Sequence, residues 1–184
     1  MISNKILINI KSLNMIYPIL KIPNKQLREK SDPILDIDKD IINILDNMAE
    51  TMYAAPGVGL AAIQIGIKKQ LVVIDCQYGE NQKKNPIFLV NPKIIWRSDE
   101  KTTYKEGCLS IPEIYEDIER SSKCKINYRD KKNRLQELDC EGLLSTCVQH
   151  EIDHLNGILF IDYLSRLKRN SIEKKFIKIN KRSS

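Results

Sequence analysis

The 184-residue chain lacks any long apolar run and contains only two histidines. No hydrophobic stretch reaches the roughly 18 residues that a membrane-spanning helix requires, so the sequence predicts no membrane span. Hydrophobic residues make up 42% of the chain and charged residues 29%, as in ordinary globular proteins. The length favours one domain that is large enough to bury a substantial core.

Paired cysteine motifs are also absent. The chain has five cysteines, an odd number, and no two of them are spaced as Cys-x-x-Cys. No secretory signal precedes them, so we expect no disulfide framework and a reducing, cytoplasmic location. Most of the thiols are expected to be buried as small apolar groups, while one remains available as a metal ligand.

The net charge of +6 is not spread evenly, because residues 166–184 hold eight basic residues and one acidic residue. Any attraction to nucleic acid is therefore expected in this basic C-terminal helix or tail. Residues 1–14 lack both an apolar core and a cleavage site, so we expect a dispensable extension and not a targeting segment. Between these two segments, residues 15–165 are expected to form a single folded domain.

Two amphipathic helices are expected near the ends of that domain. Apolar residues recur at helical spacing from Ile37 to Met52, Asp36 or Asp38 can cap this helix, and Pro56 ends it. A second helix is expected from Leu164 onward. Its expected inner positions are Leu167, Ile172, Phe176 and Ile179.

Strand signals fill most of the chain between the two helices. The expected strands are residues 71–75, 86–96, 102–106, 115–121, 123–129 and 135–140. Pro92 interrupts one of them, which predicts an edge or a bulge at that point. These elements predict an α+β fold, with mixed or antiparallel sheets packed around the helix that carries both histidines.

Both histidines lie in the segment QHEIDH, residues 149–154, which contains a His-Glu-x-x-His pattern. On a helix, His150 and His154 project from one face and can hold one metal ion, and Glu151 can act on a water beside it. Leu143 and Cys147 lie on the same face, which predicts that this face is buried. Buried imidazoles need partners, and a metal provides one.

A catalytic metal usually has three protein ligands and one open position. Cys108, in the segment EGCLSIP, is the favoured third ligand. We expect this segment to be a loop, and packing alone does not explain a cysteine there. Glu173 is the alternative, in the arrangement of a zinc endopeptidase, although it lies on a face that looks solvated. A structural metal in an RNA-associated module also stays open, and it would require a fourth protein ligand.

The segment GVGLAAIQIG, residues 57–66, is rich in small residues. It indicates either a backbone that approaches another group closely or a tight packing turn. It lacks the spacing of a phosphate-binding loop.

Three motifs, GVGLAAIQ at residues 57–64, EGCLS at 106–110 and QHEIDH at 149–154, occur together in this order. In combination they closely resemble the peptide deformylases, from Met15 to the start of the basic tail. The resemblance implies a metal-dependent hydrolase that removes the formyl group from the N-terminal formyl-methionine of newly synthesised polypeptides. It also implies Fe²⁺ as the metal, with Zn²⁺, Ni²⁺ or Co²⁺ able to substitute.

The resemblance assigns roles residue by residue. The implied metal ligands are Cys108, His150 and His154, and Glu151 is the implied general acid and base. The Gln64 side chain and the Leu109 backbone N–H would stabilise the oxyanion. The implied substrate-binding residues are Val58, Gly59, Glu106, Gly107, Leu143, Thr146 and Cys147.

Two positions depart from the family pattern near the substrate. Thr146 is less apolar than the residue often found there, and Tyr115 stands where some bacterial members carry arginine. Glu106 and Arg120 match an ion pair of relatives, so we expect that pair here. The resemblance further implies contact of the basic tail with ribosomal RNA, and we expect a monomer.

Overall fold

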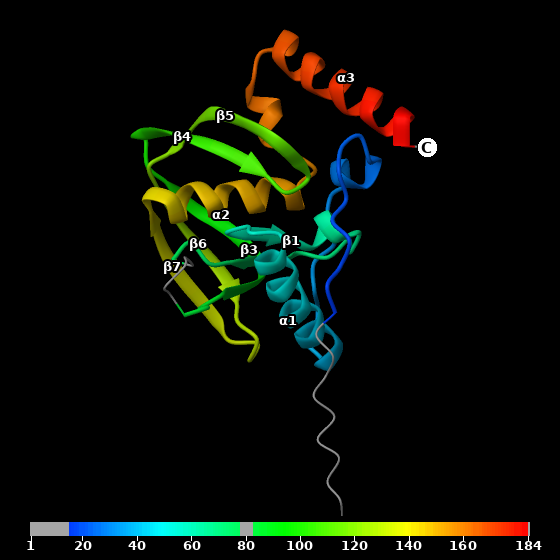
Figure 1. Ribbon diagram of the computed structural model, residues 1–184. Coiled ribbons are helices and arrows are strands. Elements are labelled where there is room, and N and C mark those ends of the chain that lie inside the picture. The colour runs from blue at the N-terminus through cyan, green and yellow to red at the C-terminus, as the bar shows by residue number, and fades with distance from the viewer. Residues whose placement is uncertain (1–14, 78–82, 184) are drawn as a thin grey trace, which may run out of the picture.

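The expected α+β fold is confirmed in a computed structural model that describes residues 15–77 and 83–183, with side chains through residue 178 (Figure 1). Every strand pairing in this part of the chain is antiparallel. The five-stranded sheet has the order β1-β2-β3-β6-β7, and its strands are β1 (Gly59–Ala61), β2 (Leu71–Ile74), β3 (Ile87–Arg97), β6 (Lys123–Arg129) and β7 (Leu135–Glu141). The two-stranded sheet pairs β4 (Lys101–Cys108) with β5 (Ile111–Ser121).

The helix α2 (Gly142–Leu155), which carries both histidines, lies between the two sheets (Figure 1). Most of its residues are buried, and it ends beside Gly157, whose φ of +73° is the expected left-handed conformation. A Cβ at Gly157 would lie 2.3 Å from the backbone oxygen of Arg28, so only glycine fits there. The helix is thus held at its C-terminal end by a segment from early in the chain.

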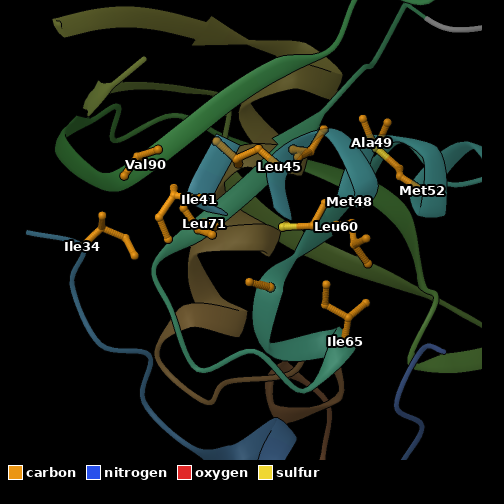
Figure 2. Packing of buried hydrophobic residues seen from close by; sticks show 12 residues of the cluster. Ile34, Ile41, Leu45, Met48, Ala49, Met52, Leu60, Ile65, Leu71 and Val90 are labelled. Atoms are coloured by element: carbon orange, nitrogen blue, oxygen red, sulfur yellow. The ribbon is translucent and has the colours of Figure 1, made fainter. Parts of the chain in front are cut away.

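The helix α1 (Lys39–Ala54) covers one part of the larger sheet. The Asp38 side chain caps it by accepting a hydrogen bond of 2.9 Å from the Ile41 N–H, which settles the choice between the two candidate caps. Its buried residues, among them Leu45 and Met48, pack with Leu60 of β1 and side chains of β2 (Figure 2). The predicted apolar face of this helix is confirmed.

The strand β3 shows why Pro92 is tolerated. It lies inside the sheet and pairs with β2 on one side and β6 on the other, so the expectation of an edge strand is wrong. The alternative expectation of a bulge is right, because the register shifts between Val90 and Lys93 and Asn91 has a φ of 51°. The Asn91 side chain binds both backbone groups of Ile34, at 2.8 and 2.7 Å, and so stabilises this irregular turn of the strand.

Cys108 is the last residue of β4 and does not lie in the loop that the sequence suggested. The pairing of β4 with β5 continues through Gly107 opposite Tyr115 and Cys108 opposite Ile111. Only two residues turn the chain between the strands. The register shifts between Gly107 and Cys108, so the hairpin holds the thiol at an irregular but paired end of β4.

Short 3-10 helices and a C-terminal helix complete the described chain: η1 (Lys25–Arg28), η2 (Ala62–Ile65), η3 (Phe160–Tyr163) and α3 (Arg166–Ser183). Ile172 and Phe176 of α3 are buried, as expected. Leu167 is 85% exposed, so its assignment to the inner face is wrong. It lies two and a half turns before Phe176 and therefore points to the opposite side of the helix.

Two other expectations lie outside the described residues: the extension at residues 1–14 and the side chain of Ile179. Within the described residues, no helix is long and apolar enough to span a bilayer. The five cysteines are free, and Cys124, Cys140 and Cys147 are buried.

Candidate active site

The structure brings Cys108 together with the two histidines of α2. One ligand atom from each of Cys108, His150 and His154 lies within 4.8 Å of the others. The Cys108 Sγ is 3.2 Å from the His154 Nε2. Glu173 lies elsewhere and pairs with Arg28 on the surface, with 3.5 Å between Oε1 and Nη2. This finding overturns the zinc endopeptidase arrangement.

The donor set suits a divalent metal of intermediate softness. The His150 Nδ1 lies 2.8 Å from the Glu106 Oε2, so Nδ1 carries the proton and Nε2 keeps a lone pair for a metal. The His154 Nδ1 and the Glu151 Oε2 are buried without a hydrogen-bond partner. Among the described residues the cluster has three protein donors, which matches a catalytic site and not a closed structural one.

The expected ion pair between Glu106 and Arg120 is confirmed. The Arg120 Nη2 donates to the Glu106 Oε2 at 3.1 Å, and its Nε donates to the other carboxylate oxygen. Both side chains are buried. Burial opposes ionisation of Glu106, but hydrogen bonds from His150 and Arg120 outweigh it and lower the pKa of this carboxyl. Glu106 is thus a charged acceptor for His150.

Glu151 lies on α2 between the two histidines in sequence and faces the cavity. Burial raises the pKa of Glu151 to about 7. A carboxyl with such a pKa can take up and release a proton near neutral pH, as general acid–base catalysis requires. The carboxylate lies so close to β1 that a Cβ at Gly59 would be 2.4 Å from its Oε1. This contact explains the glycine in the first motif as a close backbone approach.

Gln64, in η2, is held in one orientation. Its Oε1 accepts a hydrogen bond of 2.8 Å from the Ala61 N–H. Its Nε2 donates to the Ser110 Oγ at 3.2 Å and lies 3.5 Å from the Cys108 Sγ. The amide N–H₂ group therefore points toward the metal-ligand cluster. Sequence reasoning missed the contributions of Ala61 and Ser110, although both residues lie within the motifs.

Leu109 follows Cys108 at the turn between β4 and β5. Its side chain packs on the glycine-rich segment so closely that a Cβ at Gly57 would lie 2.8 Å from the Leu109 Cδ1. This contact holds the first two motifs against each other. Leu109 borders the same cavity as Gln64 and Glu151.

A cavity of about 770 Å³ opens above this cluster. Every residue that the sequence assigned to the site lines this cavity except His154, which is buried. The lining residues among them are Val58, Gly59, Gln64, Glu106, Gly107, Cys108, Leu109, Leu143, Thr146, Cys147, His150 and Glu151. Sequence reasoning missed part of the wall, including Ile16, Tyr17 and Ile19 from the N-terminal segment. No local motif marks these residues, because only the fold brings them to the cavity.

Tyr115, the position that departs from the family pattern, forms part of the cavity rim. Its ring covers Gly107, where a Cβ would lie 2.6 Å from the Tyr115 Cε1. Tyr115 itself is 61% exposed. Tyr115 thus gives this part of the rim an aromatic surface.

Comparisons with known proteins find similar sequences and similar folds. A family model described as polypeptide deformylase matches residues 16–170. The peptide deformylase of Rhizobium meliloti (strain 1021) is 49% identical over 166 residues, which cover 90% of this chain and 95% of the relative. A crystal structure of a peptide deformylase from Legionella pneumophila has a TM-score of 0.83 and 40% identity, and the match covers 92% of this chain and 98% of that one. A structure of the Ehrlichia chaffeensis peptide deformylase in complex with actinonin has a TM-score of 0.83 and 37% identity, over 89% of this chain and 96% of that one.

Proposed function

This chain belongs to the polypeptide deformylase family, and we propose that Cys108, His150 and His154 hold its catalytic metal, with Glu151 as the proton carrier. The enzyme is a metal-dependent hydrolase that removes the formyl group from the N-terminal methionine of newly made polypeptides. The observation that carries the residue assignment is the cluster of a half-buried thiol and two buried imidazoles beside the Glu151 carboxyl, at one wall of the cavity.

A formamide carbonyl is a poor electrophile, so its hydrolysis requires an activated water. The metal would supply Lewis-acid activation of water near neutral pH. The Glu151 carboxylate takes the proton of the attacking water and later delivers it to the departing amine nitrogen. The pKa of about 7 suits Glu151 to both proton transfers.

Attack on the formyl carbon places negative charge on the former carbonyl oxygen. We assign the stabilisation of this charge to the Gln64 Nε2 and the backbone N–H of Leu109. Gln64 is already held in place by its bonds to Ala61 and Ser110, so little reorganisation is needed when the charge develops. One preorganised donor of this kind can lower a barrier by about 3 kcal/mol.

The substrate peptide is proposed to bind as an added strand. Among the described residues, β1 is an edge strand of the larger sheet and β4 pairs only with β5, so each offers an edge to a peptide backbone. Val58, Gly59 and Gly107 border the cavity along these edges. The methionine side chain would enter the cavity between Glu106 and the face of α2 that is formed by Leu143, Thr146 and Cys147.

We propose Fe²⁺ as the native metal, with Zn²⁺, Ni²⁺ or Co²⁺ as substitutes. One thiolate and two imidazoles form a donor set that is compatible with each of these ions. The ligands therefore do not select one ion, and the native ion depends on which metals the cell supplies and on their oxidation. A metal analysis of protein purified without oxygen would identify the bound ion.

For the molecule as a whole, we propose a catalytic domain at residues 15–165 that acts as a cytoplasmic monomer. The basic segment at residues 166–184 would contact ribosomal RNA near emerging chains. Lys174, Lys175 and Lys178 lie on the exposed side of α3, while Ile172 and Phe176 attach the helix to the domain. The exposed lysines are therefore available to bind the phosphate backbone of RNA.

The test is hydrolysis of formyl-Met-Ala-Ser by protein purified anaerobically with iron, beside a Glu151→Ala variant that is loaded in the same way. We expect formate release by the unaltered chain and a loss of at least about 100-fold in the variant, because its general base is absent. Equal activity of the two proteins would refute the role of Glu151. Absence of activity in both would refute the proposed site.

A further inference from the structure

We propose that Asp153 and Tyr163 are positioning residues for the metal ligand His150 and act on it through Arg120 and Glu106. This inference rests on the proposed metal site. It assigns a role in metal retention to a tyrosine that lies outside the cavity wall.

The contacts begin at the buried guanidinium of Arg120 on β5. Its Nη1 donates to the Asp153 Oδ2 at 2.7 Å, while its Nη2 donates to the Glu106 Oε2 at 3.1 Å. The same Glu106 oxygen accepts the His150 Nδ1–H at 2.8 Å. One guanidinium thus joins two carboxylates, and one of these carboxylates orients the imidazole.

Tyr163, at the end of η3, completes the network from the solvent side. Its hydroxyl donates to the Asp153 Oδ2 at 2.8 Å, the oxygen that also accepts from Arg120. Its ring lies over the Arg120 guanidinium, 4.8 Å from the ring centre to Cζ. Tyr163 is 51% exposed, whereas the Arg120 side chain is 3% exposed. The tyrosine therefore separates a buried charge network from water.

A positioning role follows from the way that the acceptor atoms are shared. The Asp153 Oδ2 holds Arg120 and Tyr163 together, and the Glu106 Oε2 holds Arg120 and His150 together. If Tyr163 lost its hydroxyl, water would compete for Asp153 and the guanidinium would lose part of its support. Outer hydrogen-bond partners of this type typically change metal affinity by about 10- to 100-fold.

The chain contains a matched control for this interaction. The Tyr53 hydroxyl donates to the Asp75 Oδ2 at 2.6 Å, and the Lys84 Nζ lies 4.4 Å from the centre of its ring. This tyrosine on α1 therefore makes the same two kinds of contact as Tyr163. It has no hydrogen-bonded path to the metal ligands among the contacts described above. Tyr53→Phe removes a comparable hydrogen bond, and we expect it to leave the position of His150 unchanged.

The experiment uses the Co²⁺-loaded protein and records the thiolate-to-cobalt absorption while a chelator removes the ion. We expect Tyr163→Phe to release Co²⁺ about 10-fold faster than the unaltered chain, and Asp153→Asn to release it at least as fast. Tyr53→Phe should release Co²⁺ at the unaltered rate. Saturating metal should restore kcat in Tyr163→Phe, while KM for a formyl peptide stays constant.

Release of Co²⁺ from Tyr163→Phe at the same rate as from Tyr53→Phe would overturn the inference, even if both variants melt at a lower temperature. If Asp153→Asn does not fold, Tyr163→Phe alone decides the question. Failure of the unaltered chain to develop the cobalt–thiolate absorption would instead overturn the proposed metal site, so the two failures are distinguishable.

Discussion

At the scale of single residues, the close approach of the Gly59 backbone to the Glu151 carboxylate restricts which residue can occupy position 59. A Cβ on Gly59 would lie 2.4 Å from the Glu151 Oε1 and 2.9 Å from the Cys147 Sγ. Neither neighbour can retreat easily, because both belong to the buried face of α2. The carboxylate would have to rotate away from its position beside the cavity.

Gly59→Ala should therefore lower kcat/KM by at least about tenfold, which corresponds to roughly 1.4 kcal/mol of transition-state stabilisation. The metal content should remain that of the unaltered chain, because the atoms nearest to a Cβ at Gly59 belong to Glu151 and Cys147 and not to a histidine. Steady-state kinetics on formyl-Met-Ala-Ser and metal analysis of the same sample would measure both quantities. Unchanged kinetics would show that Glu151 is free to move.

The third metal ligand allows a direct comparison of two residues. Cys108→Ser should lose most of its bound metal, since a serine hydroxyl is a poor replacement for a thiolate. Glu173→Gln should retain the metal, because Glu173 pairs with Arg28 on the surface. Metal content after desalting would test both variants. Retention of metal by Cys108→Ser would contradict the proposed ligand set.

At the scale of an element, the cap of α1 distinguishes two aspartates that sequence alone left equivalent. The Asp38 side chain accepts a hydrogen bond from the Ile41 N–H at the first turn of the helix. The Asp36 side chain accepts no hydrogen bond from the described residues. Asp38 is therefore the capping residue, and Asp36 can serve as a control that does not cap the helix.

Asp38→Ala should lower the free energy of unfolding by about 1 kcal/mol, the typical value for a lost N-cap. Asp36→Ala should change it by less than about 0.5 kcal/mol, as expected for a surface substitution. Urea denaturation of both variants in one buffer would give the comparison. An equal loss of stability in both would indicate that the Asp38 hydrogen bond does not support the helix.

At the scale of the whole molecule, α3 combines an inner face that belongs to the core with an outer face that is basic. Ile172 and Phe176 pack in one hydrophobic cluster with Phe160 and Ile161. Deletion of the helix would therefore expose core residues as well as remove charge. Substitution of outer lysines separates the two effects.

Replacing Lys174, Lys175 and Lys178 together by glutamine should weaken binding to ribosomes and make it less dependent on salt. The melting temperature should change little, since these exposed side chains form no ion pair among the described residues. Sedimentation with ribosomes at several salt concentrations would measure the slope. An unaltered slope would refute the proposed contact of the basic tail with RNA.

Much of the site could be predicted from local patterns, because each motif is a short segment with its own chemistry. His150 and His154 are neighbours on one helix face wherever that helix forms, and Glu151 accompanies them. The apolar period from Ile37 to Met52 likewise predicted α1 and its buried side, although the helix begins at Lys39. The prediction for Leu167 was wrong, because this residue lies two and a half turns before Phe176 and therefore on the opposite side of α3, which helical spacing could have shown.

The sequence by itself determined the donor types, the helical spacing of the histidines and the location of the basic segment, since these depend on residues close together in the chain. Only the tertiary structure decided that Cys108, and not Glu173, meets the histidines, because that choice depends on how the β4–β5 hairpin packs against α2. The same packing gave the cavity its N-terminal wall and joined Tyr163 to His150 through Arg120. Contacts between distant segments follow from the burial of the whole core, which no local pattern records.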